Sequence, residues 1–134
     1  MNVKSVKKIS AFIVSLFVLL NLVACGEISK IKSTDWDFVK VSADGSSITK
    51  GMIESADLSV PSISFSGNKC ILNSFGNTIE MTYTKDKDGW YDLYYDGTNI
   101  GSMQYKKYSS DDYYSLTLGL SVLGYNQDFY FKEK

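Results

Sequence analysis

The stretch T-I-E-M-T-Y-T, residues 78–84, alternates strictly between polar and apolar side chains. In an extended chain, successive side chains point to opposite faces, so Ile79, Met81 and Tyr83 share one side and the polar residues share the other. A period of two residues is typical of a β-strand with one buried face and one wet face. Residues 113–120 repeat the pattern. These stretches predict an antiparallel β fold.

Turn signals separate the other extended segments. Gly and Asn at 67–68 and Asp and Gly at 96–97 accept positive φ at low cost, and residues 85–89 form a third turn. Short turns pair sequential strands antiparallel, which predicts an up-and-down meander. The expected strands are residues 35–42, 62–66, 69–74, 78–84, 90–95, 98–106, 113–120 and 127–132.

A meander of about eight strands must hide its edges. Pairing the first strand with the last closes a small barrel, which leaves no edge exposed. Residues 48–57 break the β pattern, and they predict a short helix that holds Met52, Ile53 and Ala56. Gly51 and the β-branched residues weaken a helix, so a ninth strand remains an alternative there.

The amino terminus has the layout of an export signal. Lys4, Lys7 and Lys8 precede the apolar run I-S-A-F-I-V-S-L-F-V-L-L at residues 9–20. A membrane-spanning helix needs about 20 apolar residues, and this run is shorter. We therefore expect a cleaved signal segment.

Leu22, Val23, Ala24 and Cys25 end this segment, in the order of an aliphatic residue, a small or β-branched residue, Ala or Gly, and cysteine. This order resembles the bacterial lipoprotein signal, the lipobox. The resemblance implies cleavage between Ala24 and Cys25 and a diacylglyceryl group on the Cys25 sulfur. Two acyl chains give stable anchoring, whereas one gives only marginal binding. An ordinary cleaved signal and an uncleaved anchor are the alternatives.

This signal predicts an exported protein that is lipid-anchored at the outer face of the bacterial cytoplasmic membrane. It also divides the chain into three parts. They are a lipoprotein signal peptide (1–24), a lipidated tether (25–33) and a β-barrel domain (34–134).

The composition removes several function classes. All 14 basic residues are lysine and histidine is absent, so the usual proton-transfer group, the commonest metal ligand and the arginine fork for phosphate are missing. A net charge of −1 without basic clusters argues against nucleic-acid binding. Residues 86–89 fit a hairpin turn better than a calcium loop, because Tyr95 stands where the bidentate glutamate belongs. We expect no enzyme activity, no metal and no cofactor.

Cys70 loses its only partner if Cys25 carries lipid, so no disulfide is expected. With a two-residue turn at 67–68, Phe65 lies opposite Cys70 and Ile63 lies opposite Leu72. Cys70 then shares an apolar face, where a free cysteine behaves as a small hydrophobic residue. We expect a buried structural thiol; a reactive thiol is the alternative.

The mature chain combines an expected first strand centred on Trp36, a turn at Asp44 and Gly45, a short helical insert and an aromatic last strand. On these features rests a resemblance to the small lipocalin-like lipoproteins of bacteria. It covers most of residues 34–134, although Thr34 replaces the glycine of the lipocalin signature. It implies a calycin-type barrel, which can hold a small apolar ligand.

Two functions from different classes remain open. In the first, the barrel is a non-enzymatic binding module for a small apolar or amphipathic ligand. In the second, the interior is packed and an outer patch around Trp90, Tyr94 and Tyr108 binds an envelope protein or a secreted peptide, as in immunity-type lipoproteins. The oligomeric state is not predicted. The residues expected to line a ligand cavity are Met81, Tyr83, Leu93, Tyr114 and Leu116.

Overall fold

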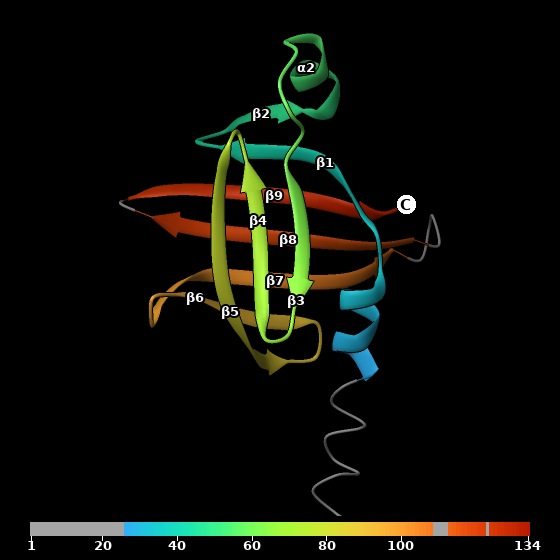
Figure 1. Cartoon of the computed structure of the whole chain (residues 1–134), viewed down its shortest axis with the longest axis vertical. Coiled ribbons are helices and arrows are strands. Elements are labelled where there is room, and N and C mark those ends of the chain that lie inside the picture. The colour runs from blue at the N-terminus through green and yellow to red at the C-terminus, as the bar shows by residue number, and fades with distance from the viewer. Residues whose placement is uncertain (1–25, 109–112, 123) are drawn as a thin grey trace, which may run out of the picture. The chain divides into compact units, whose positions relative to one another are not determined.

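The computed structural model describes residues 26–108, 113–122 and 124–134 (Figure 1). The chain divides into two compact units, Met1–Ser33 and Thr34–Lys134. The second unit begins at the residue where the sequence placed the start of the β domain. In the first unit, residues 26–33 are helical, a regular structure in the segment that the sequence marked as a polar tether.

The second unit is an antiparallel sheet that curves into a half-barrel with a short helix. Figure 1 shows β3, β4 and β5 running steeply across the direction of β6 to β9. The elements are β1 (Trp36–Ala43), β2 (Ser46–Thr49), α2 (Lys50–Ser55), β3 (Ser62–Ser66), β4 (Lys69–Ser74), β5 (Asn77–Lys87), β6 (Trp90–Tyr95), β7 (Thr98–Tyr108), β8 (Tyr113–Val122) and β9 (Tyr125–Glu133).

The hydrogen-bonded order is β2-β1-β9-β8-β7-β6-β5-β4-β3. It confirms the all-β, barrel-like meander and the pairing of the first strand with the last. The ladder does not form a full ring, because β2 and β3 stand at its two ends. β2 pairs with the second half of β1, from Lys40 to Ala43, and thereby occupies the β1 edge that β3 would need.

The interval 48–57 contains both of the structures that the sequence left open. Ser46–Thr49 forms β2, and Lys50–Ser55 forms the helix α2. Thr49 caps this helix, because its hydroxyl accepts a hydrogen bond from the Met52 backbone N–H at 3.4 Å. Ile53 is buried at 2% exposure, whereas Met52 is 56% exposed. The predicted helix is therefore confirmed, with one of its apolar residues in the core.

The hairpin turns follow the predicted chemistry. Asp96 and Gly97 both have positive φ, 50° and 79°, as type I′ turns require. In the turn between β3 and β4, Gly67 has a φ of 60°. The register of that hairpin is the predicted one, with Phe65 opposite Cys70 and Ile63 opposite Leu72.

The core lies on the inward face of the sheet, where apolar side chains alternate along the long strands such as β5 and β8, as the sequence predicted. Burial of one large apolar side chain contributes roughly 1.5–3 kcal/mol. The buried apolar side chains of the sheet are Trp36, Phe38, Val41, Cys70, Leu72, Met81, Tyr91, Leu93, Met103, Leu116, Leu118, Leu120, Phe129 and Phe131.

Candidate binding site

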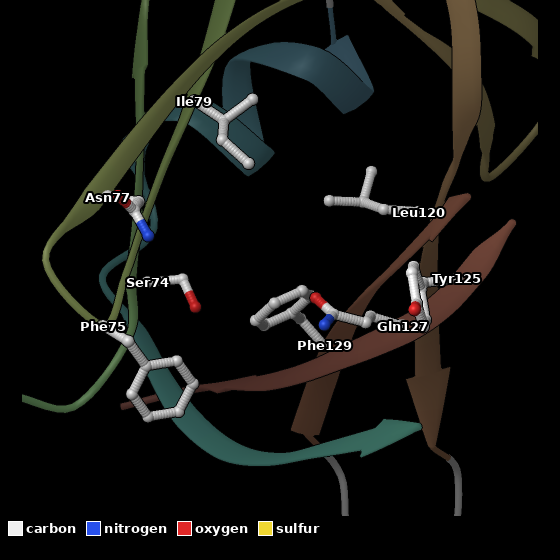
Figure 2. A pocket seen from close by; sticks show the side chains of 8 residues that line it. All are labelled: Ser74, Phe75, Asn77, Ile79, Leu120, Tyr125, Gln127 and Phe129. Atoms are coloured by element: carbon white, nitrogen blue, oxygen red, sulfur yellow. The ribbon is translucent and has the colours of Figure 1, made fainter. Parts of the chain in front are cut away.

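A hollow of about 350 Å³ opens at one end of the half-barrel (Figure 2). It lies between the β4–β5 hairpin on one side and strands β8 and β9 on the other. β6 and β7 separate these strands in the sheet, so the hollow is on the inward side of the curved sheet. Its volume falls within the roughly 300–1,000 Å³ of small-molecule sites. We call it the mouth pocket; it is lined by Ser74, Phe75, Asn77, Ile79, Leu120, Tyr125, Gln127 and Phe129.

The mouth pocket combines an apolar floor with a polar rim. Leu120 and Phe129 are 5% and 2% exposed, so they connect the pocket with the core. Figure 2 shows Ser74 and Asn77 pointing into the space from the hairpin side, while Gln127 faces it from β9. A few polar groups around an apolar surface are the usual way in which a site orients an amphipathic ligand.

Phe75, at the rim of the pocket, has an unusual backbone conformation. It occupies the first position of the β4–β5 turn with a φ of 50°, and Gly76 follows at 83°. L-residues pay roughly 1–2 kcal/mol for this left-handed conformation, and a bulky aromatic there is an outlier. The ring is 45% exposed and lies between the mouth pocket and a neighbouring hollow of about 130 Å³ that Ile48 helps to line. Outliers of this kind gather at functional sites, which makes Phe75 a candidate ligand contact.

Three of the residues predicted to line a ligand cavity are core residues. Met81, Leu93 and Leu116 face inward as predicted, but they are 1%, 0% and 0% exposed. None of them is among the residues that line the mouth pocket. The alternation identified the inward face correctly, but it does not say how deep along the barrel a residue lies.

The two predicted tyrosines lie inside aromatic clusters, and neither lines the mouth pocket. The Tyr83 hydroxyl donates a hydrogen bond to the Gly67 carbonyl oxygen at 3.1 Å, and its ring meets Tyr91 edge-on at 6.2 Å between centroids. The Tyr114 ring is stacked on Tyr105, with centroids 4.9 Å apart. These contacts fix both rings in the structure, which favours a packing role over ligand contact.

Cys70 is a free, buried thiol, as the sequence predicted. Burial raises the pKa of this thiol to about 12. The thiolate is the reactive form, so the group is inert near neutral pH. The pKa of the Tyr83 hydroxyl is also raised, chiefly by burial and to a smaller extent by the charge that Cys70 would carry as a thiolate.

The outer aromatic patch is present only in part. Trp90 and Tyr94 alternate with the buried residues of β6 and therefore share its outward face, but both are half-buried. The side chain of Tyr108 lies outside the part that the structure describes. Residues 88–89 form the hairpin turn between β5 and β6, in agreement with the preference for a turn over a calcium loop. Lys85 Nζ, on β5, lies 3.3 Å from the Asp88 carboxylate.

Sequence reasoning missed the residues of the mouth pocket because three of them form or flank a turn. Ser74, Phe75 and Asn77 surround the β4–β5 connection, which no alternation pattern marks. Two signals were available. Phe75 stands before Gly76 where Asn or Asp is usual, and Gln127 is a polar residue in the inward register of β9.

The lipobox, including Cys25, lies outside the described residues. Within the described ranges, no helix has the length and apolar character needed to cross a membrane. The chain matches no known family model, no curated protein and no solved structure.

Proposed function

We propose that this chain is an exported lipoprotein whose half-barrel binds a small apolar or amphipathic molecule in the mouth pocket. The observation that carries the proposal is the pocket itself, a hollow of about 350 Å³ with an apolar floor and a polar rim. The resemblance to the small lipocalin-like lipoproteins agrees with it. The lipobox at residues 22–25 supplies the anchor, with Cys25 as the lipidated residue.

Each side of the pocket suits a different part of such a ligand. An apolar body would replace water against Leu120, Phe129 and Ile79, and each 100 Å² of apolar ligand surface buried there contributes roughly 2.5 kcal/mol. A polar end would lie at the rim, where the Gln127 and Asn77 amides offer donors and acceptors. No covalent chemistry is required, in keeping with a carrier or sensor.

Ligand binding can be tested with the neutral fluorophore N-phenylnaphthylamine and the polypeptide of residues 26–134. We expect saturable enhancement of its fluorescence. Asn77→Trp places an indole in the pocket from the exposed first position of β5 and should weaken binding about tenfold or more. Thr82→Trp, on the outward face of the same strand, is the matched control and should bind normally. Equal binding by both variants would refute the site.

The anchor can be tested independently in cells. Labelled palmitate should enter the wild-type protein and should not enter a Cys25→Ser variant, which should also accumulate as unprocessed precursor. Normal maturation of Cys25→Ser would refute lipidation, and it would leave the binding site untouched.

A further inference from the structure

The outward face of the sheet carries a row of side chains that the core does not use. Strand pairing brings six residues from six neighbouring strands into one line across the sheet. They are Lys40, Tyr130, Thr117, Gln104, Trp90 and Lys87, in that order. Strands lie about 4.8 Å apart, so the Cα atoms of Tyr130 and Trp90 are separated by about 14 Å along the sheet.

Between these two rings the surface is hollowed. A depression of about 210 Å³ lies there, and Ser102, Thr117 and Gly119 are among the residues that line it. Their side chains are short or absent, whereas Trp90 and Tyr130 on the flanking strands are long and half-buried. Short residues on β7 and β8 thus form a floor, and the two aromatic residues form walls. We call this feature the outer trough.

Lysines on the next strands contact the two aromatic rings that form the walls. Lys40 Nζ lies 4.9 Å from the centroid of the Tyr130 ring, and Lys87 Nζ lies 5.6 Å from a ring of Trp90. Both distances fall within the range of cation–π contacts. The lysines come from β1 and β5, outside the pair of rings, so the inner sides of the rings remain toward the trough.

Within the part of the chain that the structure describes, several polar side chains at the trough make no hydrogen bond. Among the described residues, the structure gives no hydrogen bond to the side chains of Gln104, Thr117 or Asp128. Asp128 leans over the floor, because a Cβ built on Gly119 would lie 3.0 Å from its Oδ1 atom. The trough therefore presents an amide, a hydroxyl and a carboxylate between two aromatic rings.

The composition of the trough favours a sugar over a peptide. β6 to β9 are interior strands with both edges paired, so no main-chain groups are available to add a peptide strand. The floor of serine, threonine and glycine lacks the apolar groove that an amphipathic helix needs. Sugar rings instead offer C–H faces for aromatic rings and hydroxyl groups for amides and carboxylates.

Local charge points to a neutral occupant. Asp128 and Asp92 belong to the row next to the aromatic one, where they lie opposite Gly119 and Ser102. Lys40 and Lys87 stand at the two ends of the aromatic row. Within these two rows, two carboxylates and two ammonium groups balance, so these rows favour neither an anion nor a cation by net charge. Lys106 and Lys132 stand in the row on the other side, opposite Ser115.

We propose that the outer trough binds a neutral oligosaccharide, with sugar rings held between Trp90 and Tyr130 and their hydroxyl groups bonded to Gln104 and Asp128. For a domain exposed outside the cell, this site would bring the protein to a glycan surface while the mouth pocket remains accessible. The proposal does not depend on a ligand in the mouth pocket.

The two tryptophans of the chain provide an internal control for the test. Trp36 is 8% exposed on the inward face, and Trp90 is on the outward face. The full chain in detergent micelles would be titrated with the trimer of N-acetylglucosamine and with the trimer of glucose, while the indole N–H signals are followed by NMR. We expect at least one sugar to shift the Trp90 signal in a saturable way while the Trp36 signal stays in place.

Variants locate the sugar. Tyr130→Ala should weaken binding about tenfold, whereas Tyr95→Ala removes an exposed aromatic outside the trough and should have no effect. Gly119→Ala adds one methyl group to the floor under Asp128 and should also weaken binding. Asn77→Trp in the mouth pocket should leave sugar binding unchanged, which separates this proposal from the proposed function.

Three outcomes would overturn the proposal. They are no shift of the Trp90 signal by either sugar at millimolar concentration, an unchanged affinity of Tyr130→Ala, and a stronger response of Trp90 to a neutral hexapeptide than to the sugars. The last outcome would assign the trough to a peptide instead.

Discussion

Replacing Phe75 by asparagine tests whether the residue in the strained turn contributes to ligand binding in the mouth pocket. Asparagine adopts the left-handed conformation readily, so the change should relieve about 1 kcal/mol of backbone strain. The ring is 45% exposed, so its buried part contributes about half of the roughly 1.5–3 kcal/mol of a fully buried phenylalanine. The two terms nearly cancel, and the free energy of unfolding should change by less than about 1 kcal/mol.

Ligand affinity should respond differently. Phe75 lines the mouth pocket, and loss of its ring should weaken binding of N-phenylnaphthylamine about tenfold. Stability would be measured by urea unfolding followed by circular dichroism, and affinity by fluorescence titration.

The turn at Asp96 and Gly97 is a control that measures the cost of backbone strain alone. Asp96 has the same φ of 50° and does not line the mouth pocket. Asp96→Asn should be nearly neutral, whereas Asp96→Phe should cost about 1–2 kcal/mol without affecting ligand binding. The reasoning is refuted if Phe75→Asn loses more than about 2 kcal/mol of stability and binds the fluorophore normally, since Phe75 would then be an ordinary core residue.

Three further predictions test the fold. Gly101→Ala should lower the free energy of urea unfolding by more than about 4 kcal/mol, because the added Cβ would collide with the Gly119 carbonyl oxygen. Gly51→Ala, with open space around it, should instead be neutral or stabilising. Native protein should not react with a thiol reagent at Cys70 near neutral pH, and rapid labelling there would contradict the burial of the thiol. Because burial raises the Cys70 pKa from 9.0 to about 12, the unfolded state loses this proton first. Wild-type stability, measured relative to Cys70→Ala, should therefore fall as the pH rises from about 9 to about 12.

Most of the fold could be predicted because it depends on local signals. Alternation in β5 and β8 identifies the inward face, and glycine-containing turns fix the order of the strands. The register of the β3–β4 hairpin followed from its two-residue turn alone.

Other features had no local signal. β2 is exposed along its whole length, so its sequence shows no alternation, and yet it takes the β1 edge that a closed barrel would need. The bulges between Phe38 and Lys40 and between Lys85 and Lys87 add one residue to a strand without any special residue type.

In the two candidate sites, too, some features had a local sequence signal and others had none. Alternation placed Met81, Leu93 and Leu116 inside, but their depth depends on how the curved sheet packs around them. The mouth pocket is formed by a turn and a distant strand pair, and the outer trough depends on the register of six strands. Both are tertiary features, which a single strand cannot reveal.

The most direct test of the binding function is native mass spectrometry of the wild-type protein isolated from the membranes of its own host. We predict a small apolar or amphipathic molecule that remains bound to the folded protein and is absent from the Asn77→Trp variant. A wild-type protein that carries no such molecule, or one that Asn77→Trp retains equally, would contradict the account.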